Sequence, residues 1–169
     1  MAEISRHIAR AHPAILTSIL LLSLGGYVLV STSTVGPPVR VLVLTLPIGV
    51  ICLWLWAVFA VARASSGGPK HALRDVLFAV PPTLDFTAKL AGWSMNNSPA
   101  AFVFFASLFV ALWFAAQALE NADAPGNFAS VGRILVTVLI MYLAPFGVWI
   151  LHSKIMRVAD RTAASPAAA

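Results

Sequence analysis

Four long apolar runs alternate with short polar stretches along this chain. The runs cover residues 13–31, 41–62, 99–119 and 134–152, and none of them contains Asp, Glu, Lys or Arg. Each has about 20 residues, the length at which a helix rising 1.5 Å per residue crosses a hydrocarbon core about 30 Å thick. Because lipid offers no hydrogen bonds to open backbone groups, such uninterrupted runs form helices. The pattern predicts an all-α integral membrane protein with four transmembrane helices.

The polar breaks at residues 32–40 and 120–133 are short and rich in residues that form turns. The first contains a Gly-Pro-Pro sequence and the second a Pro-Gly pair. Proline fixes φ and glycine adopts backbone angles that a helix excludes, so both stretches are expected to be turns. Short turns join antiparallel neighbours. We therefore expect one membrane domain, residues 1–169, built from two antiparallel hairpins.

Lys and Arg are distributed unevenly around these runs. Of the 11 such residues, only Arg40 and Arg133 lie in the two turns. Basic loops stay in the cytoplasm, so the turns are predicted to be external, in an inner (plasma) membrane with both termini cytoplasmic. The segments assigned to the cytoplasm are 1–12, 63–98 and 153–169. This distribution accounts for the formal net charge of +5 without a nucleic-acid partner.

The connection at residues 63–98 is the longest one and has an amphipathic pattern. Apolar residues recur there at helical spacing, with charged residues between them. This pattern is typical of short helices that lie in the membrane interface, where a Trp ring keeps its N–H in water. The residues expected to rest on the interface are Leu73, Val76, Leu77, Val80 and Trp93. The alternative for this cytoplasmic loop is a docking surface for a partner subunit.

The second and fourth runs each contain a Pro-x-Gly sequence, at Pro47 and Gly49 and at Pro145 and Gly147. Proline removes one intrahelical hydrogen bond and clashes with the preceding turn, so both helices are predicted to be kinked. The two hairpins share this order of features. An old duplication and convergent use of the same helix signals both explain it.

Small residues form strips at helical spacing on three of the runs. The hydrophobic effect does not drive helices together in lipid, so small side chains that allow close backbone approach mark contact faces. The predicted packing or partner-contact positions are Ala14, Ser18 and Gly25, then Ala60 and Ala64, and finally Ser107, Ala111 and Ala115. The neighbouring helix can belong to this chain or to another one.

Residues with catalytic or ligand-binding chemistry are sparse. The runs lack the ionisable side chains that mark ion pathways, and the chain has no nucleophile–base or phosphate-loop motif. No catalytic residue, no metal site and no enzyme activity are therefore predicted. His12 and His152 lie at the ends of the first and fourth runs and are the candidate positions for a cofactor such as haem. The spacing of these two histidines does not by itself predict a cofactor, and binding of haem or quinone stays an open alternative.

Composition and charge support three hypotheses about function. With 60% hydrophobic and 10% charged residues, the chain is far from the composition of a soluble domain. The first hypothesis is a non-catalytic accessory or scaffold subunit that binds the lipid bilayer and other membrane subunits, or itself. The alternatives are a small homo-oligomeric channel or transporter, and a haem- or quinone-binding electron-transfer subunit.

Overall fold

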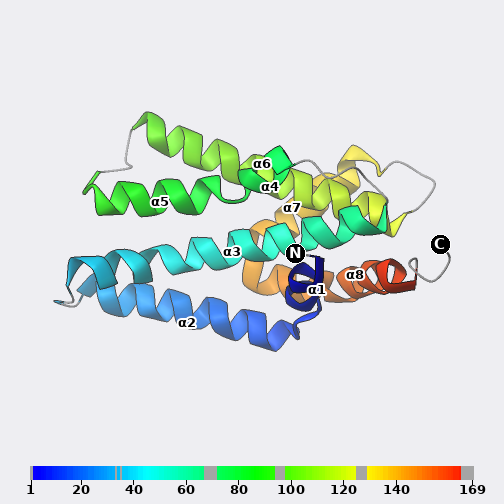
Figure 1. The fold of residues 1–169 in the computed structure, drawn as a ribbon, viewed down its shortest axis with the longest axis horizontal. Helices are drawn as coiled ribbons and strands as arrows, with labels where there is room; N and C mark the ends of the chain where they lie inside the picture. Colours follow the sequence, from blue (N-terminus) through cyan, green and yellow to red (C-terminus); the bar gives the residue numbers. More distant parts are fainter. Residues whose placement is uncertain are drawn as a thin grey trace.

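The computed structural model is a bundle of helices elongated in one direction (Figure 1). It describes residues 2–32, 34, 36–66, 72–93, 98–124 and 129–164. The helices of these residues are α1 (Ala2–Arg10), α2 (Pro13–Thr32), α3 (Pro37–Ser65), α4 (Ala72–Leu77), α5 (Val80–Leu90), α6 (Pro99–Asp123), α7 (Val131–Tyr142) and α8 (Ala144–Ala164). The described residues form no strand, which confirms the predicted all-helical class.

Three of these helices fit a multi-pass membrane protein. Among the described residues, α2, α3 and α6 are long and apolar enough to cross a membrane. They begin at prolines, which suit the first helical turn because its N–H groups have no intrahelical partner. The start of α6 is capped by Ser98, whose side chain accepts a hydrogen bond from the Ala101 N–H. The prediction of four spans is not confirmed.

The fourth apolar run divides into two helices instead of forming one kinked span. The helix α7 has only 12 residues, and its C-cap, Leu143, has a non-helical ψ of 49°. The N–H groups of Phe146 and Gly147 then both donate to the Leu143 carbonyl at 2.9 Å, which starts α8. Because Pro145 lies in this first turn, its missing N–H breaks no helical bond. The predicted kink at Pro145 and Gly147 is thus a complete break.

Glycine at position 147 allows the chain to turn back sharply at this break. A Cβ atom added to Gly147 would lie 2.2 Å from the Ile140 carbonyl oxygen, far inside van der Waals contact. Figure 1 shows α8 leaving the break back towards the end of the molecule from which α7 came. The helices α7 and α8 therefore form a helical hairpin, whose tip is at Leu143.

The tip of this α7–α8 hairpin lies beside the beginning of α2. The Thr17 hydroxyl lies 3.4 Å from the Pro145 carbonyl oxygen and accepts a hydrogen bond from the Trp149 indole N–H at 3.0 Å. Thr17 is four residues after Pro13, about 6 Å along the helix axis. The tip thus reaches the first turns of α2 and does not extend along the whole helix.

The central segment also takes a different path from the predicted interfacial loop. Near one end of α3, Arg63 lies 4.0 Å from the Asp75 carboxylate. Near the other end, the Lys89 ammonium donates to the Leu44 carbonyl oxygen at 2.7 Å. Leu44 and Arg63 are about 28 Å apart along the helix axis. The segment from α4 to α5 therefore runs back along α3.

This return path makes α3 and α6 parallel (Figure 1). The predicted topology placed these two helices in separate hairpins and gave them opposite directions, and this expectation is not confirmed. The charged residues of this segment, which include Asp85 and Lys89, were part of the amphipathic pattern that predicted an interfacial position, since isolated charges are costly away from water. In the structure the two side chains pair with each other at 2.5 Å, which lowers that cost.

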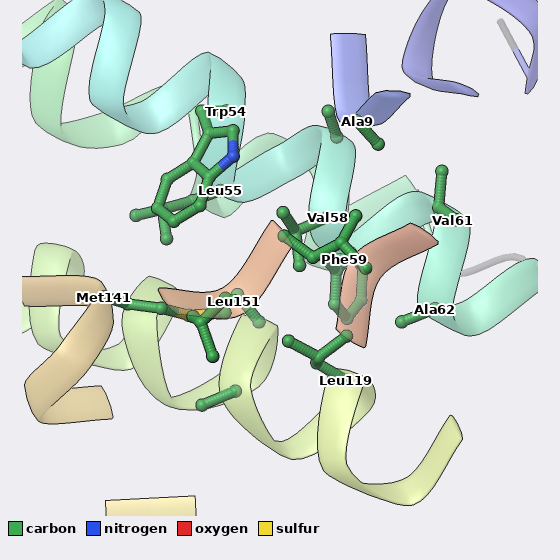
Figure 2. Packing of buried hydrophobic residues seen from close by; sticks show 14 of the residues in the cluster. Ala9, Trp54, Leu55, Val58, Phe59, Val61, Ala62, Leu119, Met141 and Leu151 are labelled. Carbon is green, nitrogen blue, oxygen red and sulfur yellow. The ribbon is translucent and has the colours of Figure 1, made fainter. Parts of the chain in front are cut away.

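Buried apolar residues from the second halves of α3 and α6 pack together in the core (Figure 2). Leu55 and Ala57 of α3 and Ala111 and Ala115 of α6 are completely buried there. Leu151 of α8 joins them. The predicted kink site at Pro47 and Gly49 lies outside this region, and α3 continues through it as one helix.

Candidate functional sites

Six charged residues meet where α6, α7 and α8 approach one another. We call them the junction cluster: Glu120 and Asp123 of α6, Arg133 of α7, and Lys154, Arg157 and Arg161 of α8. Spacings of three and four residues place the α8 cations on one helix face, and the two α6 carboxylates are three residues apart. Complementary charged faces therefore join helices that are distant in sequence.

Glu120 is the buried centre of the cluster, with 1% of its surface exposed. Its Oε1 atom accepts a hydrogen bond from the Lys154 ammonium at 2.5 Å and another from the Thr137 hydroxyl. The Arg133 Nη2 atom lies 2.9 Å from Oε2, although no N–H is aligned for a hydrogen bond to it. A buried carboxylate is costly unless it is paired. Glu120 meets this requirement through two helices other than its own.

Asp123 forms the outer part of the cluster. Its carboxylate accepts a hydrogen bond from Arg157 at 3.3 Å and lies 3.9 Å from the Arg133 guanidinium. Arg161 donates to the backbone carbonyls of Ala122 and Asp123 at 2.9 and 3.2 Å. These carbonyls are at the end of α6, where the helix dipole favours a cation. The α8 side chains thus cap α6.

The junction cluster brings two segments that were predicted on opposite sides of the membrane to the same end of the molecule. Residues 120–133 were expected to be external and residues 153–169 cytoplasmic. The Lys154–Glu120 and Arg157–Asp123 pairs instead bring these segments into contact. The physical reason is the α7–α8 hairpin, which returns the chain to the end from which α7 starts.

A cavity of about 410 Å³ opens beside the junction cluster. It lies between α7 and α8, and Glu120 of α6 forms part of its wall. Its lining residues are Glu120, Gly132, Arg133, Val136, Thr137, Ile140, Ile150, Leu151, Ser153, Lys154 and Arg157. None of these lining residues belongs to the site positions predicted from the sequence. The complementary spacings in α6 and α8 were the available signal.

The predicted cofactor positions, His12 and His152, are brought together by α2 and α8. Their ring centroids are 6.2 Å apart, and His12 also makes an edge contact with Trp149 at 6.1 Å. The His12 Nδ1 atom accepts a hydrogen bond from the Ala14 N–H, so it caps the first turn of α2. Across the described ranges, no three His, Cys, Asp or Glu residues are grouped as metal ligands. Haem or quinone binding stays a prediction.

The small-residue strips occupy two kinds of environment. Ala111 and Ala115 are completely buried in the core that α3 and α6 share, and Ser107 is buried beside them. Ala14, Ser18 and Gly25 are exposed instead. A Cβ atom added to Gly25 would meet nothing within 4 Å. The α6 strip is therefore used within the chain, whereas the α2 strip faces outwards.

The remaining predicted positions lie around the core. Ala60 is half-buried and Ala64 is exposed at the end of α3. Val76 and Trp93 are exposed, and Leu77 and Val80 are half-buried. The Leu73 side chain lies outside the described residues.

A second polar group involves α2, α3 and α5. Besides its bonds to Leu44 and Asp85, the Lys89 ammonium lies 5.9 Å from the centre of the Tyr27 ring. We call Asp85 and Lys89 the outer pair.

These features define a class of protein: a helical, multi-pass membrane protein that combines three long apolar helices with two broken helical segments. No family model, curated protein or solved structure matches the chain.

Proposed function

We propose that this protein is a non-catalytic accessory or scaffold subunit that assembles with other membrane proteins through α2. The supporting observation is the outward position of Ala14, Ser18 and Gly25. Small side chains allow helix backbones to approach closely, and this contact replaces weak packing against lipid. The chain itself provides an example, because Ala111 and Ala115 bury the equivalent strip of α6 in the core with α3.

The position of α2 at the edge of the bundle is a second support. Of its 18-residue apolar window, only 17% is buried, compared with 33% for α3. Large apolar side chains such as Leu22 and Leu29 are also exposed. A partner helix against this face would cover apolar and small groups together.

The proposed orientation follows from the cations of the folded chain. Most cations lie at the end of the molecule where α3, α6 and α8 end: the junction cluster, Arg63, and Arg10, which pairs with Asp160 of α8. Arg40 lies at the other end, near the beginning of α3. Basic residues favour the cytoplasmic side, which therefore holds the junction cluster in an inner membrane. Arg133 belongs to this side, in contrast to its expected external position.

Purification from native membranes in mild detergent tests the assembly role. Ser18→Leu places a bulky group on the outward strip, whereas Ser31→Leu makes the same change at another exposed position of α2, about 140° around the helix. Stoichiometric membrane partners are expected with the wild type and Ser31→Leu and are expected to be lost with Ser18→Leu. Equal recovery with both variants would remove the support for this face.

A second candidate, a small homo-oligomeric channel or transporter, is favoured by the broken segments. The α-helical hydrogen bonding is interrupted at Phe78 and Ala79, between α4 and α5, and again at Leu143. Discontinuous helices in transporters free backbone groups near a transport path. Solute or ion flux into liposomes that contain only this protein would support this candidate. The candidate also predicts that the purified protein is a homo-oligomer.

A further inference from the structure

The cavity between α7 and α8 changes from polar to apolar along its length. Ile140 and Ile150 line it near the hairpin tip, and both are apolar. Arg133, Lys154 and Arg157 line it at the other end. A ligand that fills this cavity therefore needs a polar head and an apolar tail in one fixed direction.

The polar end carries an excess of positive charge. Its lining includes three cations and one carboxylate, that of Glu120. Including Asp123 and Arg161 leaves the same excess, because they have opposite charges. Glu120 holds Lys154 in place at 2.5 Å. The complementary head of a ligand is an anion.

The two arginines of the lining have donor capacity for such an anion. A guanidinium has five N–H donors, more than Arg133 and Arg157 use within the cluster. About half of each side chain is exposed, 50% for Arg133 and 55% for Arg157. The Arg133 N–H groups are not aligned with the nearby Glu120 Oε2 atom. Phosphate oxygens accept several charge-assisted hydrogen bonds at once and match this arrangement.

The apolar part of the cavity is open along the sides of α7 and α8. Val136 and Ile150 form its walls and are 57% and 59% exposed. The hairpin tip reaches the first turns of α2, as the Thr17–Pro145 contact shows. If α2 crosses the membrane, the apolar part lies at the depth of the first acyl carbons, and a lipid has direct access to it.

We propose that this cavity binds an anionic glycerophospholipid. Its phosphate lies among Arg133, Lys154 and Arg157, and the beginning of one acyl chain lies between Val136 and Ile150. Basic pockets between membrane helices on the cytoplasmic side bind anionic lipid headgroups in this way. The inference goes beyond the proposed assembly role, because a lipid can bind here whether or not α2 meets a partner.

Native mass spectrometry of the full chain in detergent tests the headgroup site. The probes are dioleoyl-phosphatidylglycerol and dioleoyl-phosphatidylcholine, which share their acyl chains and differ in net charge. Phosphatidylglycerol is expected to bind more tightly. Arg133→Gln is expected to weaken its binding by about tenfold, the effect of one charged hydrogen bond. The matched variant Arg40→Gln, at the other end of the molecule, is expected to leave binding unchanged.

Val136→Trp tests the tail site independently of charge. The exposed position accepts a larger side chain without disturbing the core, and the indole is expected to fill the apolar part of the cavity. Loss of phosphatidylglycerol binding with an unchanged unfolding temperature would support the proposal. This result would count even if the variant Arg133→Gln does not fold. Unchanged binding in Val136→Trp would overturn it.

Inorganic phosphate distinguishes a lipid headgroup from a free anion. Phosphate at millimolar concentration is not expected to displace phosphatidylglycerol, because it lacks an acyl chain. Complete displacement would identify a free-phosphate site and overturn the lipid assignment. Equal affinity for phosphatidylcholine, or equal weakening by Arg133→Gln and Arg40→Gln, would overturn it as well.

Discussion

The junction cluster and the outer pair are both ion pairs packed between helices, but they are built differently. Lys154 and Glu120 are 34 residues apart in sequence, and Glu120 is buried among three helices. Lys89 and Asp85 are four residues apart on one helix, and 25% and 16% of their side chains are exposed. The first group fixes tertiary structure. The second neutralises a local charge and attaches α5 to α3.

This difference determines what happens when one partner is removed. Glu120 is 1% exposed, so its removal deletes contacts with two other helices and leaves a buried gap, whereas Asp85 and Lys89 are partly exposed and water can replace a lost partner. Substitutions in the junction cluster should therefore destabilise the fold more than equivalent substitutions in the outer pair. Three measurements test this order.

The largest effect is expected for Glu120→Ala. It removes the hydrogen bonds of Glu120 to Lys154 and Thr137 and leaves a gap at a buried position, although Lys154 and Arg133 stay 3.8 and 3.9 Å from Asp123. Losing a buried charged hydrogen bond together with buried side-chain volume costs about 3 kcal/mol. Unfolding of the purified protein in one detergent measures the change. Glu120→Gln keeps an acceptor for Thr137 and should lose less. A change below about 1 kcal/mol in Glu120→Ala would show that the cluster does not hold the hairpin.

An intermediate effect is expected for Lys89→Met. The variant keeps the length of the side chain but removes the hydrogen bonds to Leu44 and Asp85. A hydrogen bond to a charged group contributes about 2 kcal/mol. The same unfolding assay measures the loss, and Asp85→Asn serves as the companion variant. A loss larger than that of Glu120→Ala would reverse the comparison.

The smallest effect is expected for Arg10→Gln, which removes the contact of Arg10 with Asp160 at 2.6 Å. These side chains are 36% and 64% exposed, and such surface pairs contribute less than about 1 kcal/mol. Added salt should reduce even this difference. If Arg10→Gln lowered the stability as much as Lys89→Met, burial would not determine how much each ion pair contributes to stability.

The long helices of this fold were predictable from the sequence. The run 13–31 corresponds to α2, and the run 99–119 starts at the residue where α6 begins. Length and continuity are sufficient for such elements, because a continuous apolar stretch has few alternatives in lipid. The fourth run was predicted as one span, since hydropathy does not register a change of direction. The signal for the break was Pro145 close to Gly147, a pair that predicts a kink as readily as a break.

The candidate site was harder to predict, because its residues come from three separate helices. Glu120 follows an apolar run directly, and this position suggested a water-exposed turn. Its burial depends on cations more than thirty residues away in α8, whose position depends in turn on the break at Leu143. The central segment shows the same limitation, since Asp85 is compatible with its position only beside Lys89.

The α7–α8 hairpin also has a consequence for the shape of the protein in a bilayer. If α2, α3 and α6 cross both leaflets, a hairpin whose tip stops near Thr17 adds volume to one leaflet only. In the other half of the molecule α5 lies beside α3 and α6, so that each leaflet holds a helical segment in addition to the three long helices (Figure 1). The α7–α8 hairpin is therefore balanced by α5, and the protein should partition equally into small and large vesicles of the same lipids.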